Sequence, residues 1–249
     1  MYMENKNKRV DYIEKKIAIL IDSENISSTN IELIVKESIK YGLLTIRRIY
    51  GDWTNNQLSS WKRILPIYAI QPIQQFRNTS GKNSTDSAMI IDAMDILYSN
   101  FVDGFIIVSS DSDYTKLAVR LRESGKLVVG IGEKKTPQSL INACNEFKFI
   151  ENLQESYKYF IKESSTEEPD KEVKDAKDEL LSILIESYEM IDQESEWKHL
   201  SAMAHNLKKL DPGFDPRNYG STKLSKLIVK YDKYFEMKSV KKAIYVRKK

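Results

Sequence analysis

Two carboxylates one residue apart, Asp111 and Asp113, stand directly after an apolar run in FIIVSSDSDYTKLAVRLRESG, a stretch that begins at residue 105. The residues that follow have the apolar spacing of an amphipathic helix. Such a pair can cap the helix and complement its dipole. It can also bind a divalent cation, because hard cations prefer oxygen ligands. Taken alone, the pair leaves both interpretations open.

A third carboxylate, Asp22, ends an earlier apolar run, KKIAILIDSEN, in which residues 17–21 are all apolar. Taken alone, Asp22 could cap the following helix or form a turn. Asn25 is typical of a turn or a cap, but three residues past Asp22 its amide could also orient a ligand or a metal-bound water.

The helix expected from residue 85 supplies a fourth candidate. Asp86 lies in its first turn, whereas Asp92 and Asp95 lie further along the helix. Helical neighbours come at spacings of three and four, so the three carboxylates do not share one face. We therefore prefer Asp86 for the site and keep Asp92 as a secondary candidate. Asp86 could equally be an ordinary N-terminal helix charge.

The composition narrows the chemistry. Cys144 is the sole cysteine, which excludes a disulfide within the chain and a Cys-based zinc site. The histidines, His199 and His205, both come late in the sequence, which excludes a Ser-His-Asp triad beside these acids. Carboxylates that converge in a cleft repel one another until a cation joins them. Oxygen ligands favour Mg²⁺ or Mn²⁺, which can activate water for attack on a phosphate ester.

Strands and helices must alternate to position these acids. Strand patterns cover residues 17–22, 43–53, 68–76, 103–113, 126–132 and 147–153, with helix patterns between them. This order predicts an α/β fold with a parallel sheet and helices on both faces. Pro72 indicates an edge strand or a strand end. In such sheets the site lies at the carboxyl ends of the strands, where Asp22 and the Asp111/Asp113 pair fall.

The chain changes character after this region. We expect an N-terminal tail over 1–14, the α/β domain over 15–155 and a charged linker over 156–178, of which 163–178 could also be a solvated helix start. Residues 179–249 carry three helix patterns and two short alternating runs, which predicts a small winged-helix domain. Lys223, Lys226 and Lys230 follow one another at helical spacing there and could contact phosphates, although lysines also form ordinary solvated faces.

The length, composition and net charge of the chain are those of an ordinary globular protein. The chain has 249 residues, is 41% hydrophobic and 30% charged, and carries a net charge of +3. No apolar stretch approaches the roughly 20 residues of a membrane-spanning helix, and the N-terminus lacks the apolar core of a secretory signal. We expect a cytoplasmic protein with no membrane partner.

Two other folds were weighed. A dinucleotide-binding Rossmann domain fails because no G-x-G-x-x-G follows the first strand. A Toprim-type enzyme acting on DNA also has an acidic first strand and an Asp-x-Asp, but its first-strand acid is a glutamate, whereas here Asp22 ends the strand and Glu24 lies beyond it. Toprim stays a minor alternative.

Residues 15–153 resemble the NYN domains, which are relatives of the PIN-domain nucleases. The resemblance rests on AILIDSENIS, GKNSTDSAMIIDAMDIL, the segment from 103 to 132 and TPQSLINACNEFKFIENL. It implies a PIN-like, Rossmannoid fold and a metal-dependent ribonuclease site. The residues that it implies as acidic ligands are Asp22, Asp86, Asp111 and Asp113, with Asn25 in support. PIN-like domains often pair, so a homodimer is one expected state.

Residues 177–249 resemble the LOTUS (OST-HTH) winged-helix domain, chiefly through FDPRNYGSTKLSKLI. The resemblance implies binding of RNA or of a partner protein. In the first domain, Arg77 and Lys82 could line the approach of RNA to the carboxylates. The interpretation we prefer is a ribonuclease that uses Mg²⁺ or Mn²⁺. A non-catalytic RNA-binding or scaffolding protein with an idle acidic site is the main alternative.

Overall fold

A computed structural model describes residues 14–76, 84–164, 171–191, 195–240 and 243–249, with only the backbone described at 84–86, 158–164 and 171–178. The chain divides into two compact units, Met1–Phe149 and Ile150–Lys249. Within the described residues, no helix is both long and apolar enough to span a membrane.

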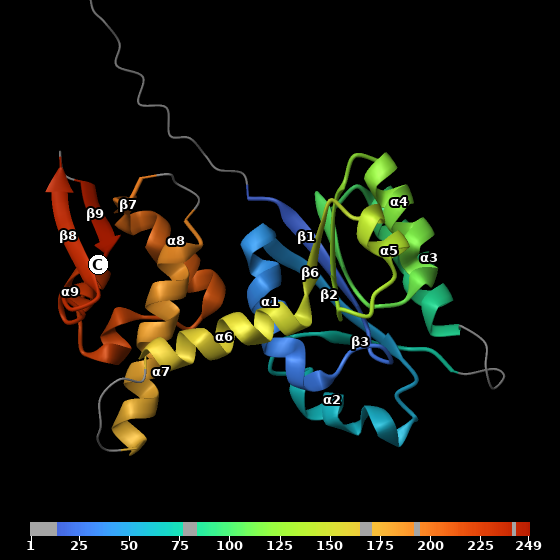
Figure 1. The fold of residues 1–249 in the computed structure, drawn as a ribbon, viewed down its shortest axis with the longest axis horizontal. Helices are drawn as coiled ribbons and strands as arrows, with labels where there is room; N and C mark the ends of the chain where they lie inside the picture. Colours follow the sequence, from blue (N-terminus) through green and yellow to red (C-terminus); the bar gives the residue numbers. More distant parts are fainter. Residues whose placement is uncertain (1–13, 77–83, 165–170, 192–194, 241–242) are drawn as a thin grey trace, which may run out of the picture. The chain divides into compact units, whose positions relative to one another are not determined.

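The first unit is built on a six-stranded sheet in the order β3-β2-β1-β4-β5-β6, with every neighbouring pair parallel (Figure 1). The predicted parallel α/β sheet is confirmed. Its strands are β1 (Lys16–Asp22), β2 (Leu43–Gly51), β3 (Gln71–Gln74), β4 (Gly104–Val108), β5 (Leu127–Gly132) and β6 (Glu146–Phe149). Pro72 lies in β3, which is an edge strand, as predicted from its missing N–H.

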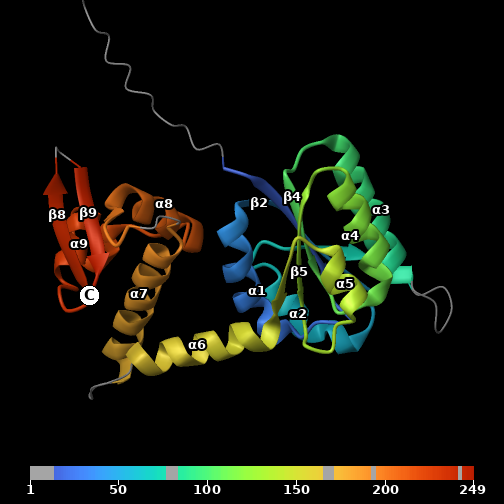
Figure 2. The ribbon, with the colours of Figure 1, turned by 45° about the horizontal axis from the view of Figure 1, so that its top comes forward.

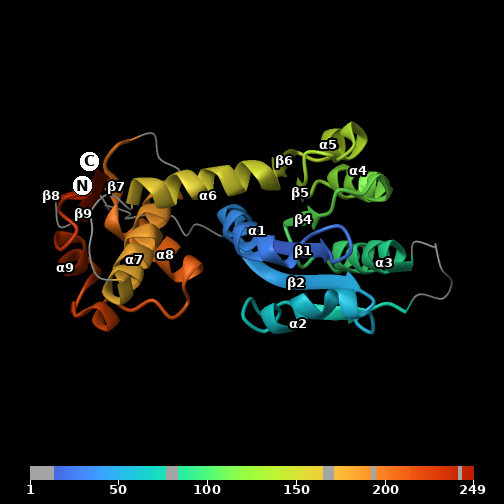
Figure 3. The ribbon, with the colours of Figure 1, turned by 60° about the horizontal axis from the view of Figure 1, so that its bottom comes forward.

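Helices cover both faces of this sheet, also as predicted. They are α1 (Ile31–Ser38), α2 (Ser59–Ile64), α3 (Ser84–Ser99), α4 (Thr115–Glu123) and α5 (Gln138–Ala143), with short 3-10 turns η1 (Ser28–Asn30), η2 (Ile39–Tyr41), η3 (Asn56–Leu58) and η4 (Ser112–Tyr114). The helices α3, α4 and α5 lie side by side (Figure 1, Figure 3), and α1 lies across the sheet from them (Figure 2).

Strand alternation sorts the side chains between the two faces. Ala18 and Leu20 of β1 are fully buried in one core cluster with Met89 of α3 and Leu117 of α4. Asp22 has the same parity as Ala18 and Leu20, so it ends the strand on the side of α3 and α4.

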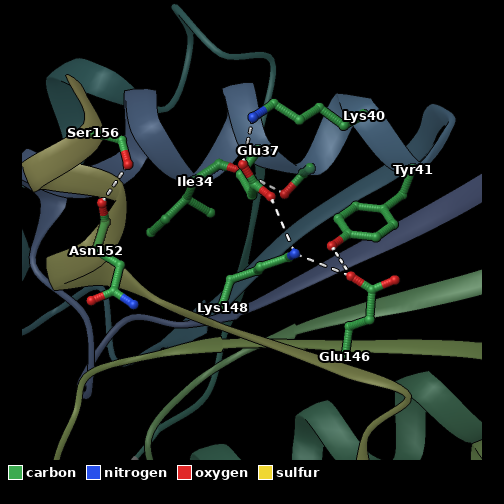
Figure 4. A network of polar contacts seen from close by, with 9 residues as sticks. Ile34, Glu37, Lys40, Tyr41, Glu146, Lys148, Asn152 and Ser156 are labelled. Carbon is green, nitrogen blue, oxygen red and sulfur yellow. Dashed lines mark hydrogen bonds and ion pairs between the residues drawn. The ribbon is translucent and has the colours of Figure 1, made fainter. Parts of the chain in front are cut away.

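An ion-pair network ties β6 to η2 near the start of the strand, at the amino-terminal edge of the sheet (Figure 4). The Lys148 Nζ lies 3.1 Å from a Glu146 carboxylate oxygen and 4.0 Å from one of Glu37. Lys40 pairs with Glu37 at 2.7 Å, and the Tyr41 hydroxyl donates to Glu146 at 2.9 Å. The hydrogen bonds from Tyr41 and Lys148 lower the pKa of Glu146. Acidic side chains at this edge are thus matched by cations.

The second unit combines helices with a three-stranded antiparallel sheet in the order β7-β9-β8. Its elements are α6 (Ile150–Ser164), α7 (Lys171–Glu189), β7 (Lys198–His199), α8 (Leu200–Leu210), η5 (Pro216–Tyr219), α9 (Leu224–Val229), β8 (Phe235–Val240) and β9 (Ala243–Lys248). Its core includes Leu184, Met203, Leu207 and Val246. Much of the segment 156–178, where we expected a charged linker, is helical in α6 and α7.

Candidate active site

Asp22 is the last residue of β1 and is almost completely buried, with 1% of its surface exposed. Three neutral groups donate hydrogen bonds to its carboxylate. They are the Glu24 backbone N–H at 3.0 Å, the Asn25 side-chain amide at 2.5 Å and the Ser109 hydroxyl at 3.0 Å. The Asn25 amide thus holds one oxygen of Asp22, and its role toward a ligand or a metal-bound water stays a prediction.

Burial raises the pKa of Asp22, although the hydrogen bonds from Asn25, Glu24 and Ser109 act in the opposite direction. The nearby charge of Glu24 raises it further. Among the described residues, no lysine or arginine forms an ion pair with this carboxylate. Asp22 therefore differs from Glu146 at the other edge of the sheet, where Lys148 supplies a positive charge.

Ser109, which the sequence analysis did not single out, joins the two acidic segments. It is fully buried just beyond the end of β4, where Ile21 and Val108 are paired across the sheet. Its hydroxyl donates to Asp22 and accepts a hydrogen bond from the Asp111 backbone N–H at 3.1 Å. The strand ends thus bring Asp22 and the Asp111 segment to one edge, as expected for a parallel sheet.

Asp111 and Asp113 occupy the turn between β4 and α4. One oxygen of Asp111 caps η4 by accepting from the Asp113 backbone N–H at 2.9 Å. Its other oxygen accepts no hydrogen bond from the described residues. Asp111 is partly buried and Asp113 is exposed. The capping interpretation is therefore realised by one oxygen of Asp111, and a second carboxylate oxygen is left for a ligand.

A surface pocket of 610 Å³ opens beside Asp113. It is lined by the start of α4, by α3 and by α5. The lining residues are Ser87, Ile90, Ser112, Asp113, Thr115, Lys116 and Ser139. Hydroxyl groups and one lysine next to a carboxylate suit a phosphate-containing ligand.

The other predicted residues of the first unit have different outcomes. Asp86 lies in the first turn of α3, as expected, but its side chain is outside the described residues. Arg77 and Lys82 also lie outside the described residues. Asp92, the secondary candidate, accepts short hydrogen bonds from Arg48 and from the Tyr50 hydroxyl, both of β2.

The partners of Asp92 give it a structural role. Burial, followed by the hydrogen bond to Asp92, raises the pKa of Tyr50, so the phenol stays protonated and keeps donating. Arg48 supplies the positive charge that balances the carboxylate. Asp92 therefore joins α3 to β2 and has its oxygens already occupied.

The donor set bears on whether a metal ion fits. Among the side chains that the structure describes, no three of His, Cys, Asp and Glu lie together closely enough to hold an ion. The set implied by the family resemblance has a fourth member, Asp86, that lies beyond this description. The chemistry of the members present is suitable: they are hard oxygen donors, and no lysine or arginine in the described part of the chain pairs with the buried Asp22. The chemistry of these donors thus suits Mg²⁺ or Mn²⁺, although the described side chains alone do not complete a site.

The three lysines of the second unit are exposed, and they differ in their contacts. Lys223 precedes α9, Lys226 lies within it and Lys230 follows its end. The Lys230 Nζ donates to the backbone carbonyls of Tyr219 at 3.1 Å and Gly220 at 2.9 Å. Lys230 therefore holds the turn before α9, which leaves Lys223 and Lys226 as the freer charges of this stripe.

Comparison with known proteins identifies the domain families that the chain matches. The model of the NYN domain matches residues 16–151, and that of the OST-HTH/LOTUS domain matches residues 171–246. Among curated proteins, none matched the chain. Among solved structures, a protein of unknown function from Vibrio parahaemolyticus RIMD 2210633 has 21% sequence identity and a TM-score of 0.49. That match covers 61% of this chain and 98% of the other.

Proposed function

The chain belongs to the NYN domain family of PIN-like nucleases, and from this premise we propose that it is a ribonuclease that needs Mg²⁺ or Mn²⁺. The observation that carries the proposal is the environment of Asp22. A carboxylate is buried at the carboxyl end of a central parallel strand, no cationic side chain that the structure describes pairs with it, and Ser109 links it to the Asp111 segment. Burying an unpaired carboxylate costs free energy that a bound cation would return.

The chain's own residues would hold and orient the reacting groups. Asp22, Asp86, Asp111 and Asp113 would provide the oxygens that bind the cation. Asn25 and Ser109 keep the Asp22 carboxylate in one orientation, which preserves the geometry that catalysis requires. When bound, the ion would stabilise the negative charge that develops on a phosphate and make water a stronger nucleophile.

The second unit would recruit the substrate. Residues 171–246 match a domain family that binds RNA, and the exposed Lys223 and Lys226 are suited to phosphate contacts. Joined in one chain, the two units would raise the local concentration of RNA at the carboxylates. A homodimer, a protein partner of the second unit and a cytoplasmic location stay predictions.

The test replaces one carboxylate and follows cleavage. Labelled single-stranded and structured RNAs are incubated with Mn²⁺, with Mg²⁺ or with EDTA. We expect wild type to cleave only with metal and Asp111→Asn to lose activity by at least about a hundredfold, as expected for a metal ligand. The matched control is Asp95→Asn, which removes an exposed carboxylate of α3 and should leave cleavage unchanged. Cleavage by Asp111→Asn at the wild-type rate would refute the assignment.

A non-catalytic RNA-binding protein is the second candidate, because one oxygen of Asp111 is already used as a helix cap. Calorimetry with Mn²⁺ separates the two functions. The proposed enzyme should bind Mn²⁺ and lose that binding in Asp111→Asn. If wild type binds RNA but neither binds Mn²⁺ nor cleaves, the acids are structural and the second candidate holds.

A further inference from the structure

A second pocket, of 350 Å³, lies directly beyond Asp22 and is distinct from the one beside Asp113. It is formed by the segment after β1 and by η3 with the start of α2. The lining residues are Ser23, Glu24, Ile26, Ser27, Ser28, Asn55, Gln57, Leu58, Ser60 and Trp61. Ligand pockets of proteins begin at about 300 Å³, so the space suffices for one small group.

A buried hydroxyl in this pocket, that of Ser23, has no hydrogen-bond partner among the residues that the structure describes. Ser23 is only 4% exposed, and its Oγ makes no hydrogen bond within the described residues. The side chain fills the space above Gly51, where a Cβ would come within 2.1 Å of that Oγ. Buried hydroxyls are nearly always hydrogen-bonded, so one without a partner points to a partner from outside the chain.

The polar groups of this pocket are almost all neutral. The Ser28 hydroxyl donates to that of Ser60 at 3.0 Å, and Asn55 accepts from the Gln57 backbone N–H at 2.9 Å. The one charged lining residue, Glu24, is negative. A phosphate would be repelled here, whereas hydroxyls and amides match the donors and acceptors of a base or a ribose.

We propose that this pocket binds the nucleoside adjacent to the phosphate that lies at Asp22, with Ser23 and Gln57 as its hydrogen-bonding residues. The inference rests on the proposed ribonuclease function. Ser23 follows Asp22 in the chain, and successive side chains at a strand end face opposite sides of the sheet, so the pocket and the carboxylate lie on either side of the carboxyl end of β1, where an RNA strand that crosses this edge would contact both. Single-stranded RNA offers such a group because its bases can be splayed out.

The experiment uses the full chain and RNAs that differ only in the position of one abasic nucleotide around the cleavage site. For wild type, one position next to the cut should lower kcat/KM about tenfold when its base is missing, the loss expected for one hydrogen bond. Ser23→Ala and Gln57→Glu should lower kcat/KM by a similar factor on intact RNA and no longer respond to the abasic nucleotide.

The controls separate folding and charge from binding. Ser23→Ala should keep the wild-type unfolding temperature, because its hydroxyl has no hydrogen bond to lose. Gln71→Glu adds the same charge as Gln57→Glu on the exposed surface of β3 and should behave as wild type. If both pocket variants respond to the abasic position as wild type does, the nucleoside site is refuted while the ribonuclease stands.

A crosslinking experiment tests the pocket if the wild-type protein does not cleave RNA. Should wild type not cleave, the same RNAs carrying one 4-thiouridine are irradiated with the full chain, and the attached peptide is identified by mass spectrometry. Attachment within residues 55–61 that is lost in Gln57→Glu supports the pocket although the enzyme assignment has failed. No attachment in this segment overturns the proposal.

Discussion

Replacing Ser109 by alanine tests whether the two acidic segments depend on one buried hydroxyl. The change removes a hydrogen bond to the Asp22 carboxylate and the acceptor of the Asp111 backbone N–H. A hydrogen bond to a charged group contributes about 1.5–3 kcal/mol, and a neutral one about 1 kcal/mol. Since Ser109 is fully buried, water cannot replace either bond. We expect Ser109→Ala to lower the free energy of unfolding of the first unit by about 2–4 kcal/mol.

Hydrogen exchange of the β1 and β4 amides measures this loss in the first unit alone. The matched control is Ser38→Ala, which removes a hydroxyl that is also fully buried but donates only to the Ile34 carbonyl of its own helix, at 2.6 Å. The control should lose about 1 kcal/mol or less. Equal losses in the two variants would refute the account of Ser109.

A second measurement separates positioning from stability. The hydrogen bond from Ser109 lowers the pKa of Asp22, so its removal should raise that pKa further. Because a metal ligand must be ionised, Mn²⁺ binding by folded Ser109→Ala should begin at a higher pH than in wild type. An unchanged pH profile would limit Ser109 to a structural role.

Two further predictions concern single side chains. In EDTA at neutral pH, Asp22→Asn should unfold at a higher temperature than wild type, because burial raises the pKa of Asp22 and a neutral side chain costs less to bury. This difference in unfolding temperature should vanish as the pH falls below the ordinary carboxyl pKa of 3.8, where Asp22 is protonated in both the folded and the unfolded chain. Lys230→Ala should lower the stability of the second unit by about 0.5–1 kcal/mol, whereas Lys226→Ala should leave it unchanged and weaken RNA binding with a smaller salt dependence. Denaturant unfolding measures the stability of both lysine variants, and RNA affinities over a series of salt concentrations measure their binding.

The sequence predicted the sheet and the edge at which the acids meet, because these depend on local signals. Apolar runs of strand length that end in Asp22 and before Asp111 are visible without any structure, and alternation with helices requires parallel strands. Ser109 was missed because its role depends on the pairing of β1 with β4. Serines are common near strand ends, and a periodic pattern carries no information about which strands are neighbours.

Contacts between residues far apart in the sequence explain where the structure differs from the other predictions. Helical spacing separated Asp92 from Asp86, but it could not reveal that Arg48 and Tyr50 of β2 occupy Asp92. Likewise, the lysine stripe of α9 could be read from spacing, whereas the bonds of Lys230 depend on a left-handed Gly220 that exposes carbonyls to it. In each case the decisive contact comes from residues far from the pattern or from a backbone conformation.

The segment 163–178, which was expected to be a charged linker or a solvated helix start, shows how weakly composition determines local structure. Its many charges and few large apolar residues are typical of a linker. Those charges, however, are mostly Glu and Lys, which are good helix formers. The helix α7 begins at Lys171, and from Leu180 onward its apolar side chains pack into the core of the second unit. A helix whose apolar side chains are buried from Leu180 onward thus begins within the charged stretch.

Of the acidic residues, Asp22 argues most strongly for a ligand. Asp111 has a role in folding, since one of its oxygens caps η4 and would be kept in a protein without any activity. Asp22 accepts a comparable bond from the Glu24 backbone N–H two residues on, but unlike Asp111 it is almost completely buried. Its three donors are neutral, so none of them offsets the cost of burying the negative charge. The cost of burying this charge supports the proposal that a divalent cation binds at Asp22, because hard cations prefer oxygen ligands.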